Sequence, residues 1–165
     1  ESGDDVVLKA VKKGVSGPEA IEAGKRVVEA GIKLSLMVII GLAGAEGSDR
    51  HARETARAIN EIKPNMLSAL TLMLYRGSEL LDQYEKGEFA PLSPQGIMLE
   101  LHKIISLVEL PPEGHCLFRS NHVSNYVQLA ATLPKDKDRL LGQIAQAADE
   151  LGKWKDWDVY NNTRY

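Results

Sequence analysis

Two apolar runs separated by a helical pattern place the strongest constraint on the fold of this chain. Residues 33–40 and 66–74 are rich in leucine and β-branched residues, with few polar interruptions. Such runs are typical of parallel strands that are covered on both faces. The helix predicted between them ends before Pro64, and its buried face carries Ala52, Thr55, Ala56, Ile59 and Ile62. The pattern predicts a right-handed βαβ unit and an α/β fold.

Caps and apolar periodicity predict further helices on both sides of this unit. The predicted helices cover residues 6–13, 16–30, 48–63, 78–85, 93–108 and 134–151, with Asp4 or Asp5 capping the first and Ser48 the third. A third strand is predicted at residues 115–119, and the tail from Trp154 has no regular period. Two or three strands are too few to pair both edges of a sheet. We therefore expect either more of a longer protein, or a second copy of the chain, to cover an exposed strand edge.

Composition excludes several classes of protein. The chain has 165 residues, 44% of them hydrophobic, which suffices for one domain with a core. Its net charge is −3 and its charges are dispersed, so we expect no nucleic-acid partner. The longest apolar run, residues 34–42, is about half the length needed to cross a bilayer. The single cysteine, Cys116, allows no internal disulfide and fits a cytoplasmic protein.

Two glycine-containing loops follow the predicted strands, at the end of a parallel sheet where ligands collect. The loop at residues 41–47 precedes a helix and is compatible with either a tight turn or ligand binding. In the loop at residues 75–78, Arg76 is compatible either with binding a carboxylate or phosphate or with a solvated position.

The segment from residue 119 to residue 126 is unusually polar for its position between apolar stretches. It is compatible with a pocket wall or with a tightly hydrogen-bonded turn, and His122 and Asn125 are its candidate catalytic residues. Together with His115 and Cys116, His122 provides too few ligands for a zinc site. We therefore predict no metal site in this chain and interpret Cys116 as a buried small hydrophobe.

Four segments, taken in order, resemble the radical S-adenosylmethionine superfamily, in the iron–sulfur oxidoreductase branch that includes oxygen-independent coproporphyrinogen oxidases and elongator-type enzymes. They are residues 1–8 with 12–14, the helix ending at Gly31, residues 38–44 and residues 75–80. The resemblance covers residues 1–110 and extends weakly to about residue 145. It implies a partial TIM-like barrel of parallel βα units with additional C-terminal helices.

The resemblance also implies an S-adenosylmethionine site. The loop at residues 1–3, and a lysine that follows it, would approach the ribose and the amino-acid portion of S-adenosylmethionine. The end of the first predicted strand would lie behind the adenine, and the loop at residues 75–77 would lie along the same ligand. The residues carried over by position are Glu1, Ser2, Lys12, Lys13, Ile39, Ile40, Gly41, Tyr75, Arg76 and Gly77.

The three cluster cysteines of that family, spaced C-x3-C-x2-C, are absent, and one cysteine cannot hold a [4Fe–4S] cluster. We expect the cluster to belong to a missing N-terminal half, which would make the parent enzyme able to cleave S-adenosylmethionine reductively to a 5′-deoxyadenosyl radical. The isolated chain is then expected to be inactive. The opening residues Glu1 to Asp5, which read as a loop after a strand, agree with this interpretation.

The predicted organisation has βα units over residues 1–110, a C-terminal extension over 111–151 and an irregular tail over 152–165. Two alternatives remain open at this point. One is a non-catalytic α/β interaction module that forms homo-oligomers through its sheet edge. The other is a metal-dependent lyase that uses Glu46, Asp49 and Glu79 near the strand ends. The small-molecule substrate is not identified by the sequence.

Overall fold

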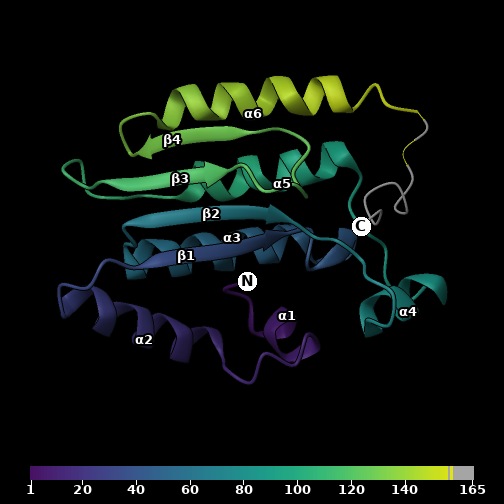
Figure 1. Ribbon diagram of the computed structural model, residues 1–165, viewed down its shortest axis with the longest axis horizontal. Coiled ribbons are helices and arrows are strands. Elements are labelled where there is room, and N and C mark those ends of the chain that lie inside the picture. Colours follow the sequence, from purple (N-terminus) through teal and green to yellow (C-terminus); the bar gives the residue numbers. More distant parts are fainter. Residues whose placement is uncertain (156, 158–165) are drawn as a thin grey trace.

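The structure, a computed structural model, describes residues 1–155 and residue 157. Within them, helices and strands alternate along most of the chain (Figure 1). The helices are α1 (Asp5–Ala10), α2 (Gly17–Glu29), α3 (Gly44–Ile62), α4 (Glu79–Glu85), α5 (Pro94–Leu107) and α6 (Lys137–Leu151). The strands are β1 (Ser35–Ile40), β2 (Met66–Thr71), β3 (Cys116–Ser120) and β4 (Leu129–Leu133).

The four strands form one sheet in the order β1-β2-β3-β4. β1 pairs with β2 in parallel along its whole length, whereas β2 pairs with β3 only from Met66 to Ser68. This arrangement confirms the predicted α/β class and is consistent with a partial barrel. β4, which no sequence pattern predicted, is antiparallel to β3. The sheet also runs across the predicted boundary near residue 110, and the division into domains stays a prediction.

Several element boundaries differ from the sequence predictions. α3 begins at Gly44 and has no side-chain cap, whereas Ser48 was the predicted cap. The carbonyl of Ala90 takes the place of a cap, because it accepts a hydrogen bond from the backbone N–H of Ala45 at 2.7 Å. β2 ends at Thr71 rather than at residue 74, and α6 begins three residues after Pro134. The predicted irregular tail lies mostly outside the described residues.

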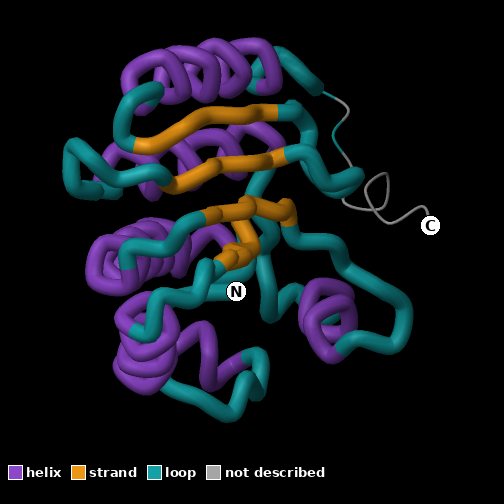
Figure 2. Tube along the Cα trace, turned by 60° about the vertical axis from the view of Figure 1, so that its left-hand side comes forward, coloured by secondary structure: helices purple, strands orange, loops and turns teal. Residues whose placement is uncertain are grey.

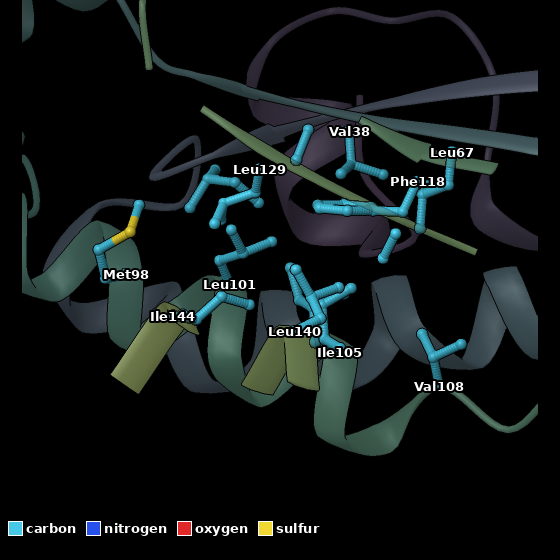
Figure 3. Packing of buried hydrophobic residues seen from close by; sticks show 14 of the residues in the cluster. Val38, Leu67, Met98, Leu101, Ile105, Val108, Phe118, Leu129, Leu140 and Ile144 are labelled. Atoms are coloured by element: carbon cyan, nitrogen blue, oxygen red, sulfur yellow. The ribbon is translucent and has the colours of Figure 1, made fainter. Parts of the chain in front are cut away.

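The core lies between one face of the sheet and the helices α3, α5 and α6. Figure 3 shows Val38, Leu67 and Phe118 from the strands facing Leu101 and Ile105 of α5. The predicted stripe of α3 is confirmed, since all five of its residues are buried. In α5, Ile97, Leu101 and Ile104 are also buried, as is Val108, which caps its C-terminus.

The opposite face of the sheet is open in the described part of the chain. Figures 1 and 2 show α3, α5 and α6 on one side of the strands, with no described helix over the other. Met37 is 62% exposed there, Leu117 41% and Met66 39%. The prediction that β1 is covered on both faces was therefore wrong at Met37. The apolar sequence of β1 suits a second covering layer that the described residues do not supply.

The two edges of the sheet differ in how their backbone groups are satisfied. On the β4 edge, Asp136 binds both backbone groups of Thr132: its carboxylate accepts from the N–H at 2.9 Å, and its own N–H donates to the carbonyl at 2.8 Å. Arg139 donates to the carbonyl of Ala130 at 3.2 Å. On the β1 edge, Ile39 donates its N–H to the carbonyl of Glu1 at 2.9 Å. The β4 edge is thus largely closed to another strand.

We expect Asp136→Ala to destabilise the protein at neutral pH and to have little effect in acid. The backbone hydrogen bond from Thr132 lowers the pKa of the Asp136 carboxyl, with Arg139 contributing in the same direction. A lowered pKa in the folded state means that the stabilisation is present above the ordinary aspartate pKa of about 3.9 and is lost as the pH falls through the lower value. Urea titrations at several pH values measure this. A difference between variant and parent that stays constant with pH would contradict it.

Candidate functional site

The candidate site lies where the parallel strands end. The carboxyl ends of β1 and β2 point toward α4 in Figure 1, and the loops after them carry Gly41 and Tyr75. The N-terminal segment reaches the same region, because Glu1 binds the backbone of Ile39. In this family of folds, the carboxyl ends of the strands are the usual place for ligands.

The N-terminal segment is held tightly against α3. The N–H of Gly3 donates to the hydroxyl of Thr55 at 3.1 Å, and a side chain at Gly3 would lie 2.3 Å from the carbonyl oxygen of Glu54. Asp4 caps α1, as predicted, and its other carboxylate oxygen accepts from Arg50 at 2.7 Å. Arg50 therefore pairs with this buried carboxylate, whereas Glu54, four residues further along α3, pairs with Arg57.

Two exposed ion pairs connect the predicted ligand residues. The ammonium group of Lys13 lies 2.8 Å from the Glu1 carboxylate, and this hydrogen bond lowers the pKa of Glu1. Lys12, whose φ of 56° is left-handed, pairs with Glu79 at the start of α4. Exposed pairs of this kind contribute about 0–1 kcal/mol, so a ligand would compete with them easily.

Tyr75, Arg76 and Gly77 form the exposed loop between β2 and α4. Gly77 has a φ of 80°, and Ser78 caps the helix that follows. The Lys12–Glu79 pair joins α4 to the first loop of the chain. The structure thus brings Glu1, Ser2 and the two lysines, the end of β1, and the residue 75–77 loop to one end of the sheet. Whether these residues bind a ligand stays a prediction.

A buried polar network holds the end of β1. Glu100 of α5 accepts a hydrogen bond from the N–H of Gly41 at 2.7 Å, and the same oxygen lies 3.1 Å from Nδ1 of His51 on α3. Both side chains are fully buried. Nε2 of His51 and the second oxygen of Glu100 have no partner among the described residues. Sequence reasoning missed both residues, although a glutamate beside Leu101 in an apolar helix was a usable signal.

Asn125 continues the hydrogen bonding of β2 where β3 turns away from it. Its amide nitrogen donates to the carbonyl of Ala69 at 2.9 Å, and its amide oxygen accepts from the N–H of Thr71 at 2.8 Å. The polar segment is therefore a hydrogen-bonded turn at this residue. His122 lies nearby and contacts the hydroxyl of Ser124 at 2.9 Å. A catalytic role for His122 or Asn125 stays a prediction.

A cavity of about 30 Å³ lies at the carboxyl ends of β1 and β2, which is room for about one or two water molecules. We call it the tip cavity. Its lining residues are Gly41, Thr71, Leu72, Leu74, Pro91, Leu92, Ile97, Tyr126 and Trp157. The indole N–H of Trp157 donates to the hydroxyl of Tyr126 at 3.3 Å. Most of the lining is apolar, with hydroxyl groups contributed by Thr71 and Tyr126.

The described residues do not fit an iron–sulfur cluster. Cys116 is buried in the core, and this burial raises the pKa of its thiol to about 11, so it lacks the thiolate that a cluster needs. No group of three histidine, cysteine or acidic side chains gathers in the described part of the chain. Of the carboxylates proposed for a lyase, Asp49 pairs with Arg53 and Lys103, and Glu79 pairs with Lys12.

Comparison with known proteins gives a likeness to solved structures. Neither the family profiles nor the curated proteins yield a match to this sequence. Among solved structures, archaeal Elp3 of Methanocaldococcus infernus, with residues 1–46 deleted, is similar with a TM-score of 0.61 and 18% identity. The likeness covers 92% of this chain and 34% of that protein, so this chain spans about a third of its length. At this identity the likeness shows a shared fold. Within the described residues, no helix is long and apolar enough to cross a membrane.

Proposed function

We propose that this chain is the later part of a radical S-adenosylmethionine iron–sulfur enzyme and supplies part of its nucleotide site. The observation that carries the proposal is the position of the matched segments. Residues 1–5, the end of β1 and the 75–77 loop are far apart in sequence and lie at one end of the parallel strands. The fold likeness to Elp3 supports the same reading.

In this proposal, the exposed groups of the site bind and orient S-adenosylmethionine. Glu1 and Lys13 present a carboxylate and an ammonium group to the amino-acid portion, which carries both charges. Arg76 is available to bind a carboxylate in the same region. Ile39, Ile40 and Gly41 support the adenine, and the Glu100 hydrogen bond fixes the backbone of Gly41 in its left-handed conformation.

The cluster would be held by a partner segment, the N-terminal half that carries the family's cysteines. When bound there, it supplies the electron that cleaves S-adenosylmethionine. The open face of the sheet, with Met37 and Leu117, would then face the enclosed space of the completed barrel, where the unidentified small-molecule substrate binds. We also propose a cytoplasmic location, because the single cysteine is free and buried, as suits a reducing compartment.

The alternative is a non-catalytic interaction module that forms homo-oligomers. Its specific support is the open apolar face together with an incompletely covered β1 edge. The two proposals differ in their ligand. The module binds no S-adenosylmethionine and buries its open face against another copy, whereas the enzyme part binds the nucleotide.

Binding of S-adenosylhomocysteine, a stable analogue, tests the nucleotide site on this chain by calorimetry. We expect weak binding that Arg76→Ala weakens further by about tenfold, because a charge-assisted hydrogen bond is lost. Arg26→Ala is the matched control: Arg26 lies on α2, is largely exposed and pairs with Glu22 of the same helix, so binding is expected to be unchanged. Equal effects of the two substitutions would contradict the proposed site.

Anaerobic reconstitution of the complete gene product with iron and sulfide tests the activity. We expect the absorbance of an iron–sulfur cluster and, with a reductant, release of 5′-deoxyadenosine. The isolated 165-residue chain, treated identically, should give neither. A complete gene product that binds no cluster would overturn the enzyme proposal and leave the interaction module.

A further inference from the structure

The two tryptophans near the C-terminal end of the described chain are placed differently. Trp154 is 57% exposed and meets Tyr126 edge to face, with ring centroids 6.2 Å apart. Trp157 is partly buried and lines the tip cavity, where its indole N–H reaches the hydroxyl of Tyr126. Only one of the two indoles therefore occupies the end of the sheet at which the proposed nucleotide site lies.

Trp157 is held in place more weakly than the residues of the core. It packs against the small cluster around Leu74 and Leu81 and is not a member of the main core. Its hydrogen bond to Tyr126, at 3.3 Å, is at the long end for an N–H donor. Withdrawal of the indole would leave the sheet and the packing of α5 against α6 intact, so it is compatible with the folded state.

The shape and chemistry of the position match a purine. Indole and purine are both flat bicycles made of a five-membered and a six-membered ring. The cavity offers apolar walls at Leu72 and Leu92, and two of its lining residues, Thr71 and Tyr126, carry hydroxyl groups. A hydroxyl both donates and accepts, so Tyr126 can bind a purine ring nitrogen as readily as an indole N–H.

We propose that Trp157 is an internal occupant of the nucleotide site, and that a purine nucleoside displaces its indole on binding. The inference rests on the proposed function, since it concerns regulation of that same site. The cavity beside the indole holds only about one or two water molecules, so a base enters it only when Trp157 leaves. Trp157 thereby lowers the affinity of the site, and the position of its indole is coupled to ligand binding.

Competition between the indole of Trp157 and a purine nucleoside has a calculable effect on the affinity of the site. A ligand that binds only the form with Trp157 withdrawn loses affinity in proportion to the fraction of molecules in that form. If the indole is seated in about nine molecules of ten, its removal raises the affinity about tenfold. We therefore expect Trp157→Ala to bind adenosine about tenfold more tightly than the parent chain, and Trp154→Ala to bind it unchanged.

Tryptophan fluorescence reports the displacement directly. In Trp154→Phe, Trp157 is the only tryptophan, and adenosine or S-adenosylhomocysteine should shift its emission to the red and increase its quenching by acrylamide. In Trp157→Phe, the remaining Trp154 should respond little. Circular dichroism verifies that each variant is folded.

The outcomes separate this inference from the proposed function. If calorimetry shows that adenosine binds while Trp157 fluorescence and the affinity of Trp157→Ala stay unchanged, the indole is not displaced and the inference is overturned, although the nucleotide site survives. If neither the parent chain nor Trp157→Ala binds adenosine or S-adenosylhomocysteine, the nucleotide site itself is refuted, and the inference with it.

Discussion

Replacing Glu100 with leucine is expected to lower the free energy of unfolding by about 3 kcal/mol. The substitution leaves the buried N–H of Gly41 and Nδ1 of His51 without their partner, and each such orphaned group costs about 1–3 kcal/mol. Urea denaturation measures the change. We also expect faster hydrogen exchange at Gly41, because its amide loses the partner that protects it.

Glu100→Gln is the matched control for this prediction. It keeps an amide oxygen that can accept from Gly41 and has nearly the same volume, so we expect a loss of about 1 kcal/mol. In the double variant with His51→Leu, the histidine no longer has to be satisfied, and Glu100→Leu should cost less than in the parent background. Equal losses for Glu100→Leu and Glu100→Gln would show that the network does not hold the end of β1.

Replacing Asn125 with alanine is expected to cost about 2 kcal/mol. The carbonyl of Ala69 loses its partner, while the N–H of Thr71 keeps only the hydroxyl of Ser124 at 3.2 Å. Denaturation in urea gives the magnitude, and faster exchange of the Thr71 amide locates the effect.

Asn121→Ala is the control for Asn125, because Asn121 lies in the same turn and its side chain is exposed. We expect it to change stability by less than about 0.5 kcal/mol. If Asn125→Ala proves equally mild, the turn is not held by this amide and the residue is free for a role at the ligand site. A large loss from Asn125→Ala would instead identify it as a structural residue.

The parts of the fold that sequence patterns predicted are those set by local chemistry. The burial of Ile59 and Ile104 follows from helical periodicity, and the capping of α1 follows from an aspartate before the first turn. β4 escaped prediction because alanines at positions 130 and 131 have little preference for strands, so that neighbouring β3 rather than the segment itself determines its conformation.

The parts of the candidate site that escaped prediction depend on contacts between distant segments. His51 and Glu100 are 49 residues apart, and Arg50 lies 46 residues from its partner Asp4. A single sequence reveals such pairs only as charged residues in unexpected places. Trp157 belongs to the same class, because its position at the tip cavity depends on where α6 ends relative to β1 and β2.

The unequal edges of the sheet limit the assemblies that this protein can form. Growth of an open-ended fibril by strand addition requires that each subunit offer two free edges, one for each neighbour. Asp136 and Arg139 occupy one of them, so strand addition can proceed only beside β1. A single addition then completes the sheet, and any association by this route stops at two partners instead of polymerising.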